Sequence, residues 1–204
     1  VPFLASTDRA SRRASCDLLA RELAFARDLG GAEFVLHLGA YSPGSDAAEG
    51  TRLFADGVAE AYERAKGAPR LTMENVPGGG RRMGGSLEEL AALRAELSAR
   101  GVESGVCLDT AHAWAAGYDV AGASGMDSFL DRAAALFGAE VVTLFHLNDT
   151  SAGLGSHREH HEHWGVGRLG AAGLTRLLNR PDFAHAAGIL ETPPGRDVEN
   201  LRFV

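Results

Sequence analysis

The sequence has few cysteines, no long apolar run and no excess of positive charge. Its two cysteines, Cys16 and Cys107, are too few for a disulfide framework. No apolar stretch approaches the roughly 18–20 residues of a membrane span, and no basic-then-apolar leader opens the chain. Twenty Lys and Arg against 27 Asp and Glu give a net charge of −7, which argues against holding nucleic acid by a basic surface alone. These absences predict a soluble protein of the reducing cytoplasm.

The remaining composition is that of one globular domain. The chain has 204 residues, of which 45% are hydrophobic and 23% charged. No low-complexity linker separates two halves, so we expect a single domain over residues 1–204. Because the first residue is Val1 and not Met, we also expect that the parent protein has a segment before it.

Short apolar runs typical of strands alternate with stretches of helical periodicity. The predicted strands are 1–5, 33–37, 70–74, 105–109, 141–146 and 188–191. The predicted helices are 8–29, 46–66, 86–100, 126–137 and 171–178, the first with Ser6 or Thr7 as N-cap. This alternation predicts βαβ units and a parallel sheet, either open and doubly wound or closed into a (β/α)8 barrel.

Five predicted strands end in a residue that can bind a metal ion. These residues are His37, Glu74, Asp109, His146 and Glu191. Barrel active sites are built at the carboxyl ends of the strands, so the pattern favours a barrel with a site at that end. The alternative is that each polar residue only marks the exit of a buried strand into solvent.

Two further groups of candidate ligands follow these strands. His112 comes three residues after Asp109, about one helical turn. The segment 157–163 is rich in histidine and could be a solvated loop or fold back over the strand that ends at His146. Imidazole nitrogens mixed with carboxylate oxygens suit Zn²⁺ best, with Mn²⁺ or Fe²⁺ possible. So many ligands indicate two or three ions that share a bridging carboxylate, an arrangement that assists phosphoryl displacement and gives an acidic protein a cationic cleft.

Several longer motifs are spread along the whole chain. They read HLGAY at 37–41, EN at 74–75, GVCLDTAHAWAAGYD at 105–119, HLND at 146–149, LGS at 154–156, HEHWGVGRLG at 161–170 and LETP at 190–193. The stretch CLDTAHAWAAGYD is the most specific of these. Together the motifs resemble the endonuclease IV family of apurinic/apyrimidinic DNA-repair nucleases, from Val1 to the C-terminus.

The resemblance implies a TIM barrel with three zinc ions. His37 and Glu74 would hold the first ion. The second would be held by Glu74 as a bridge with Asp109, His146 and Glu191, and the third by His112, Glu159 and His161. Glu159 stands where the family has Asp, and the loop after Glu74 lacks the family's Gln. Glu74 is expected to act as the catalytic base or to serve in ligation alone.

The resemblance further implies hydrolysis of damaged double-stranded DNA on the 5′ side of an abasic nucleotide, leaving a 3′-hydroxyl. Aromatic wedges and phosphate anchors would bend the DNA. The candidates are Phe3, Tyr41, Trp114, Tyr118, Arg81 and Arg82. Each could instead be a packed aromatic or part of a solvated turn. The full-length protein is expected to be a monomer.

The family barrel begins two strand–helix units earlier and has a zinc-ligating His just before the aromatic that matches Phe3. We therefore expect the chain to hold strands three to eight, with open sheet edges that make it unstable or prone to association. The rival functions are a metal-dependent sugar isomerase or epimerase on the same barrel and an inactive barrel fragment.

Overall fold

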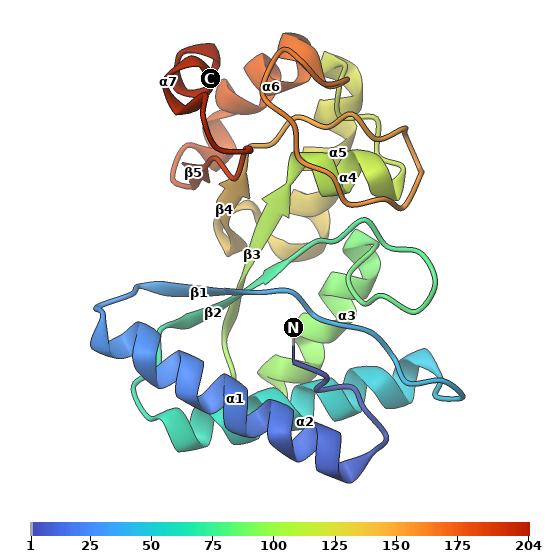
Figure 1. The fold of residues 1–204 in the computed structure, drawn as a ribbon, viewed down its shortest axis with the longest axis vertical. Helices are drawn as coiled ribbons and strands as arrows, with labels where there is room; N and C mark the ends of the chain where they lie inside the picture. The colour runs from blue at the N-terminus through green and yellow to red at the C-terminus, as the bar shows by residue number, and fades with distance from the viewer. Residues whose placement is uncertain (1) are drawn as a thin grey trace. The chain divides into compact units, whose positions relative to one another are not determined.

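The structure is a computed structural model that describes residues 2–204, and these form two compact units (Figure 1). Unit 1 comprises Val1–Glu74, Gly80–Gly84 and Glu88–Gly105. Unit 2 comprises Asn75–Gly79, Gly85–Leu87 and Val106–Val204. Both units combine parallel strands with helices, as the alternating pattern predicts.

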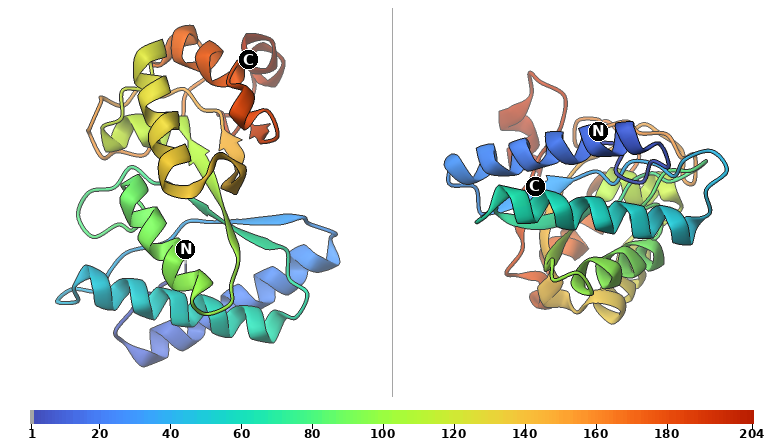
Figure 2. Two further views of the ribbon diagram at one scale, coloured as in Figure 1. Left: turned by 180° about the vertical axis from the view of Figure 1, so that it is seen from behind. Right: turned by 90° about the horizontal axis from the view of Figure 1, so that it is seen from below.

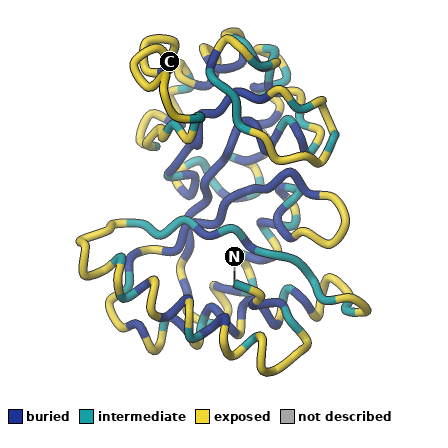
Figure 3. The backbone as a smooth tube through the Cα atoms, in the orientation of Figure 1, coloured by how far each residue is buried: buried dark blue, intermediate teal, exposed yellow. Residues whose placement is uncertain are grey.

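Unit 1 is built on two parallel strands, β1 (Glu33–Leu36) and β2 (Arg70–Glu74), paired from Glu33↔Arg70 to Leu36↔Met73. The helices α1 (Arg9–Asp28) and α2 (Ala47–Ala65) lie side by side, as both views of Figure 2 show. The helix α3 (Leu87–Ser98) follows β2. Their apolar faces supply the core of the unit, which appears as the dark stretches of the tube in Figure 3.

Both long helices of unit 1 begin at an aspartate. The Asp8 carboxylate accepts a hydrogen bond from Ser11 N at 2.8 Å, and the Asp46 carboxylate accepts one from Glu49 N at 2.7 Å. The prediction of Ser6 or Thr7 as the first N-cap is therefore wrong. The carboxylate is the side chain that satisfies an open N–H of the first turn.

The predicted strand at 1–5 is also wrong for the residues that the structure describes. Leu4 and Ala5 form a turn in which Ser6 N donates to Phe3 O at 3.1 Å, while Phe3 N donates to Ser15 Oγ at 2.8 Å. Leu4 and Ala5 are each 1% exposed. A short apolar run is buried equally well as a turn or as a strand, so hydrophobicity alone does not separate the two.

Unit 2 contains most of β3 (Ser104–Asp109), together with β4 (Val142–His146) and β5 (Ala187–Ile189). These strands are parallel, and Asp109 is the register partner of His146. The helical segments of this unit are α4 (Thr110–Ala116), α5 (Ala123–Phe137), η1 (Ala139–Val141), α6 (Gly170–Leu178), η2 (Pro181–Phe183) and α7 (Asp197–Phe203). Within residues 2–204, no helix has both the length and the apolar character needed to cross a membrane.

Candidate metal centre

The carboxyl ends of β3 and β4 bring ligand-capable side chains together in unit 2. Asp109, His146 and Glu191 each offer an atom within 4.8 Å of the others, and so do Asp109, His112 and His161. The His146 Nδ1 lies 3.0 Å from the Glu191 Oε2. Asp109 belongs to both sets and is fully buried. We call these five residues the Asp109 group.

Two imidazole rings of the Asp109 group are turned so that their Nε2 atoms converge. The His112 Nδ1 is 2.9 Å from the carbonyl of Asn75, and the His161 Nδ1 is 3.2 Å from the carbonyl of Glu191. Because a carbonyl only accepts, each Nδ1 is the donor in its contact, and in a neutral ring the Nε2 then carries the lone pair.

The two Nε2 atoms are 3.4 Å apart, and the His161 Nε2 is 3.5 Å from the Asp109 Oδ2. With both rings neutral, these atoms bring three electron-pair donors close together. A divalent cation satisfies such a donor set, and ring nitrogens fixed by backbone carbonyls are typical of metal-binding histidines.

Two buried asparagines hold Asp109 in place. The Asn75 side chain donates to Asp109 O at 3.1 Å and accepts from Asp109 N at 2.6 Å. The Asn148 Nδ2 donates to the Asp109 Oδ2 at 2.6 Å, and its Oδ1 accepts from Glu191 N at 2.9 Å. Our sequence reasoning missed both roles, although each asparagine follows a strand-end ligand within one or two residues.

A second buried carboxylate, Asp149, organises the loop that carries His161. It accepts four backbone N–H groups at 2.8–3.2 Å, from Thr150, Gly165, Gly167 and Leu169. Its own carbonyl accepts from Glu162 N at 2.8 Å. Asp149 thus fixes both ends of the segment 162–169, next to His161.

In unit 1, the strands β1 and β2 lead to His37 and Glu74. The His37 Nε2 lies 2.8 Å from the Glu74 Oε2. Glu74 is almost fully buried, whereas 36% of the His37 side chain is exposed. A buried carboxylate beside an imidazole is again a donor pair that suits a zinc ion.

The structure does not bring Glu159 into the Asp109 group. The Glu159 side chain is exposed, although His161 is only two residues further on. The other histidines of the segment have partners elsewhere: His157 bonds the carbonyl of Pro77, His160 bonds Ser151 and His163 bonds Asn200. In unit 2, His161 alone of these histidines joins a group of ligand atoms.

The predicted DNA-contacting aromatics differ in how firmly they are held. Phe3 is 62% exposed. The Trp114 Nε1 donates to the carbonyl of Ala152 at 2.9 Å. The Tyr118 hydroxyl accepts from Leu87 N at 3.1 Å, and its ring packs on Phe129. Of these three, Phe3 is therefore the side chain with an open surface, as a wedge requires.

The predicted phosphate anchors Arg81 and Arg82 lie against the loop after β1. The Arg81 carbonyl accepts a hydrogen bond from Tyr41 N at 2.9 Å, and the Arg81 Nε donates one to the Tyr41 carbonyl at 3.2 Å. Arg82 forms an antiparallel bridge with Ala40. Both arginines are exposed to solvent.

Tyr41, predicted as a wedge, is instead bonded within unit 1. Its hydroxyl donates to the Glu89 carboxylate, and its ring fills the space over Gly50. Burial and this carboxylate raise the pKa of Tyr41 to about 12. Because the folded pKa exceeds the ordinary value of 10, this group's contribution to stability is complete below pH 10 and is lost as the pH rises through 12.

Replacing Glu89 with glutamine is expected to lower the pKa of Tyr41, because the phenolate no longer faces a carboxylate. An NMR titration of ¹³C-labelled tyrosine measures the shift. Tyr62 is the internal control, since burial alone raises its pKa. An unchanged Tyr41 midpoint in E89Q would contradict this account.

The fold class of the chain follows from its similarity to known proteins. The family model of the xylose isomerase-like TIM barrel matches residues 2–203. The solved structure of a D-tagatose 3-epimerase-like protein superposes with a TM-score of 0.74 over 98% of this chain and 70% of that chain. At 18% identity, this likeness shows the fold alone. The chain therefore has the α/β fold of xylose isomerase-like TIM barrels.

Two more similar proteins narrow the class. A protein of Solibacter usitatus named "Probable endonuclease 4" is 39% identical over 97% of this chain and 70% of its own length. The crystal structure of endonuclease IV from Thermus thermophilus superposes with a TM-score of 0.83 and 36% identity, over 98% of this chain and 70% of that chain. The chain belongs to the endonuclease IV family.

Proposed function

We propose that the protein is a metal-dependent DNA-repair endonuclease that cleaves on the 5′ side of an abasic nucleotide and leaves a 3′-hydroxyl. The observation that carries this proposal is that the His161 Nε2 lies 3.4 Å from the His112 Nε2 and 3.5 Å from the Asp109 Oδ2. Relatives named endonuclease 4 supply the reaction class.

The donor set of imidazole nitrogens and carboxylate oxygens suits zinc, with manganese as an alternative. We infer three ions in all. The first would be held by His37 and Glu74, the second by Glu74, Asp109, His146 and Glu191, and the third by His112, His161 and a carboxylate from Glu159 or Asp109. Bound ions of this kind lower the pKa of water and offset the charge that develops on a phosphate.

We assign Glu74 to the ligands of the second ion. Chain connectivity supports this, because Glu74 is bonded covalently to Asn75, whose side chain pairs with the backbone of Asp109. Consecutive Cα atoms are only about 3.8 Å apart. Glu74 therefore enters the proposal as the bridging carboxylate.

Each side chain has a defined task in this proposal. Glu74 accepts the proton of the attacking water at its carboxylate, and the His37 Nε2, 2.8 Å from that carboxylate, would hold the first ion together with it. Asn148 keeps the Asp109 Oδ2 aimed at the two imidazoles. An abasic nucleotide has no base to unstack, so its extrusion from the duplex costs less than that of an intact nucleotide. The exposed ring of Phe3 is available to fill the gap that extrusion leaves.

A duplex with one tetrahydrofuran abasic analogue tests the reaction. This analogue cannot undergo β-elimination, so a cut must come from hydrolysis. With zinc or manganese supplied, we expect a single cut 5′ to the analogue and a product that a DNA polymerase extends. An intact strand after incubation with either metal would overturn the proposal. Interconversion of ketose epimers by the same preparation would favour the sugar-epimerase alternative.

A further inference from the structure

The first turns of α1 carry three arginines, Arg9, Arg12 and Arg13. They line an open groove of about 380 Å³ in unit 1, which also contains Asp56 and Glu60. Arg9 and Arg13 are exposed, and within residues 2–204 neither forms an ion pair. Arg12 is half-buried and donates to the carbonyl of Ser6 at 2.6 Å.

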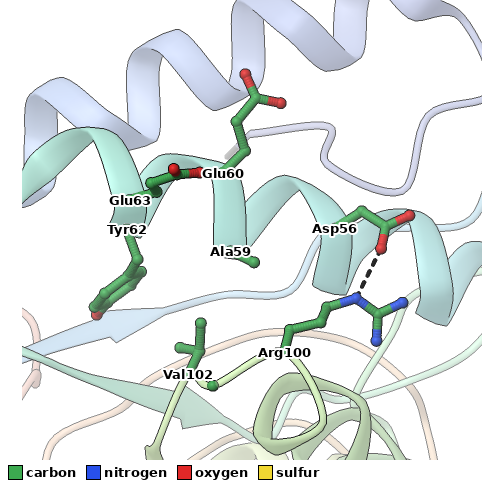
Figure 4. A pocket seen from close by; sticks show the side chains of 8 residues that line it. Asp56, Ala59, Glu60, Tyr62, Glu63, Arg100 and Val102 are labelled. Carbon is green, nitrogen blue, oxygen red and sulfur yellow. Dashed lines mark hydrogen bonds and ion pairs between the residues drawn. The ribbon is translucent and has the colours of Figure 1, made fainter.

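The acidic residues of this groove are paired with other arginines. Asp56 lies 2.7 Å from the Arg100 Nε, a contact drawn in Figure 4, and 3.3 Å from Arg52. Glu60 pairs with Arg64 at 3.5 Å. The charges of Arg9 and Arg13 are therefore not used inside the protein, and both guanidinium groups can bind an external anion.

Hydrogen bonds within unit 1 connect the start of α1 to the loops that follow β1 and β2. Thr7 N donates to Ser42 Oγ at 3.0 Å, and the neighbouring Tyr41 bonds the backbone of Arg81. Two acids near this path, Asp8 and Asp46, accept N–H groups as helix caps. The path carries five arginines, which we name the arginine rim: Arg9, Arg12, Arg13, Arg81 and Arg82.

We propose that the arginine rim binds the phosphates of duplex DNA that flank the cleaved bond. This inference rests on the proposed function, since the loops that join the start of α1 to Arg81 follow β1 and β2, the strands that lead to His37 and Glu74. A metal centre contacts the phosphate that reacts, whereas the register of a long duplex is fixed by cations along its backbone. A local row of arginines supplies these cations on a chain whose net charge is −7.

The test is the salt dependence of binding by the R9Q/R13Q variant. Fluorescence anisotropy of a labelled duplex carrying the tetrahydrofuran analogue gives Kd from about 50 to about 300 mM salt. Loss of two phosphate contacts should reduce the slope of log K against log salt by about 1.8 and weaken binding at least about 10-fold at about 0.1 M salt. An undamaged duplex should show the same change in slope, because phosphate contacts do not read the lesion.

The matched control is R21Q/R70Q, which removes the same charge from exposed positions of unit 1 outside the rim. Arg21 is about 18 Å further along α1 than Arg9. The control should keep the wild-type slope. An unchanged slope in R9Q/R13Q, or equal changes in both variants, would contradict the proposal that the arginine rim binds DNA phosphates. If R9Q/R13Q binds DNA more weakly but the wild type does not nick the abasic duplex, the role of the arginine rim in DNA binding is supported and the proposed function is contradicted.

Discussion

The Asp109→Asn variant is expected to nick an abasic duplex about 1000-fold more slowly than the wild type. Asp109 is the carboxylate shared by both sets of ligand atoms in unit 2, so a neutral amide there removes a negative ligand from two positions. Loss of about 4 kcal/mol of charge stabilisation in the transition state corresponds to three powers of ten in rate.

Asparagine is the informative replacement because it keeps the size of the side chain and the N-cap of α4, and loses the hydrogen bond from the Asn148 Nδ2. The Asp109 Oδ1 accepts from His112 N at 2.7 Å as the N-cap of α4, and asparagine caps a helix equally well. Single-turnover nicking and bound zinc would be measured together, with exposed Asp131→Asn as the control. Wild-type rate and zinc content in D109N would contradict the role given to Asp109.

The second large effect is on stability. Asp149→Ala is expected to lower the free energy of unfolding by about 3–5 kcal/mol, because its carboxylate satisfies four backbone N–H groups in a buried position. In a chain of this size, that loss shifts Tm by roughly 6–20 °C. Asp149→Asn keeps one acceptor oxygen, so its free energy of unfolding should lie between those of the wild type and the alanine variant.

Urea unfolding measures the stability of these variants, and limited proteolysis reports the loop 162–169. Trp164 lies inside that loop and donates from its Nε1 to the carbonyl of Leu147 at 2.9 Å. Its fluorescence should therefore change when the loop detaches from the rest of the unit. The loop should become the first site of cleavage in the alanine variant. A loss of less than about 1 kcal/mol, with the loop still protected, would mean that Asp149 does not organise it.

Periodicity predicted the strands and long helices of this fold because buried parallel strands are short apolar runs between amphipathic helices. It failed at residues 2–5, where Leu4 and Ala5 are buried in a turn. It also gave no separate helix for α4 (Thr110–Ala116), because seven residues make only two helical turns.

The strand-end rule predicted the ligand-capable residues, since Asp109 and His146 are register partners at the ends of adjacent parallel strands. It could not predict the supporting hydrogen bonds. Asn148 reaches Asp109 across 39 positions of sequence, and Tyr41 reaches Glu89 across 48. The orientation of the Glu159 side chain could not be predicted either, because Glu159 lies in a loop without the periodicity of a helix or strand.

The central claim is that the Asp109 group is a metal centre. Anomalous diffraction at the zinc edge, from crystals of the protein grown with zinc, tests it most directly. The account predicts a zinc peak about 2.0–2.3 Å from the Nε2 atoms of His112 and His161 and within reach of a carboxylate. Crystals that contain zinc with no peak between these two rings would contradict it.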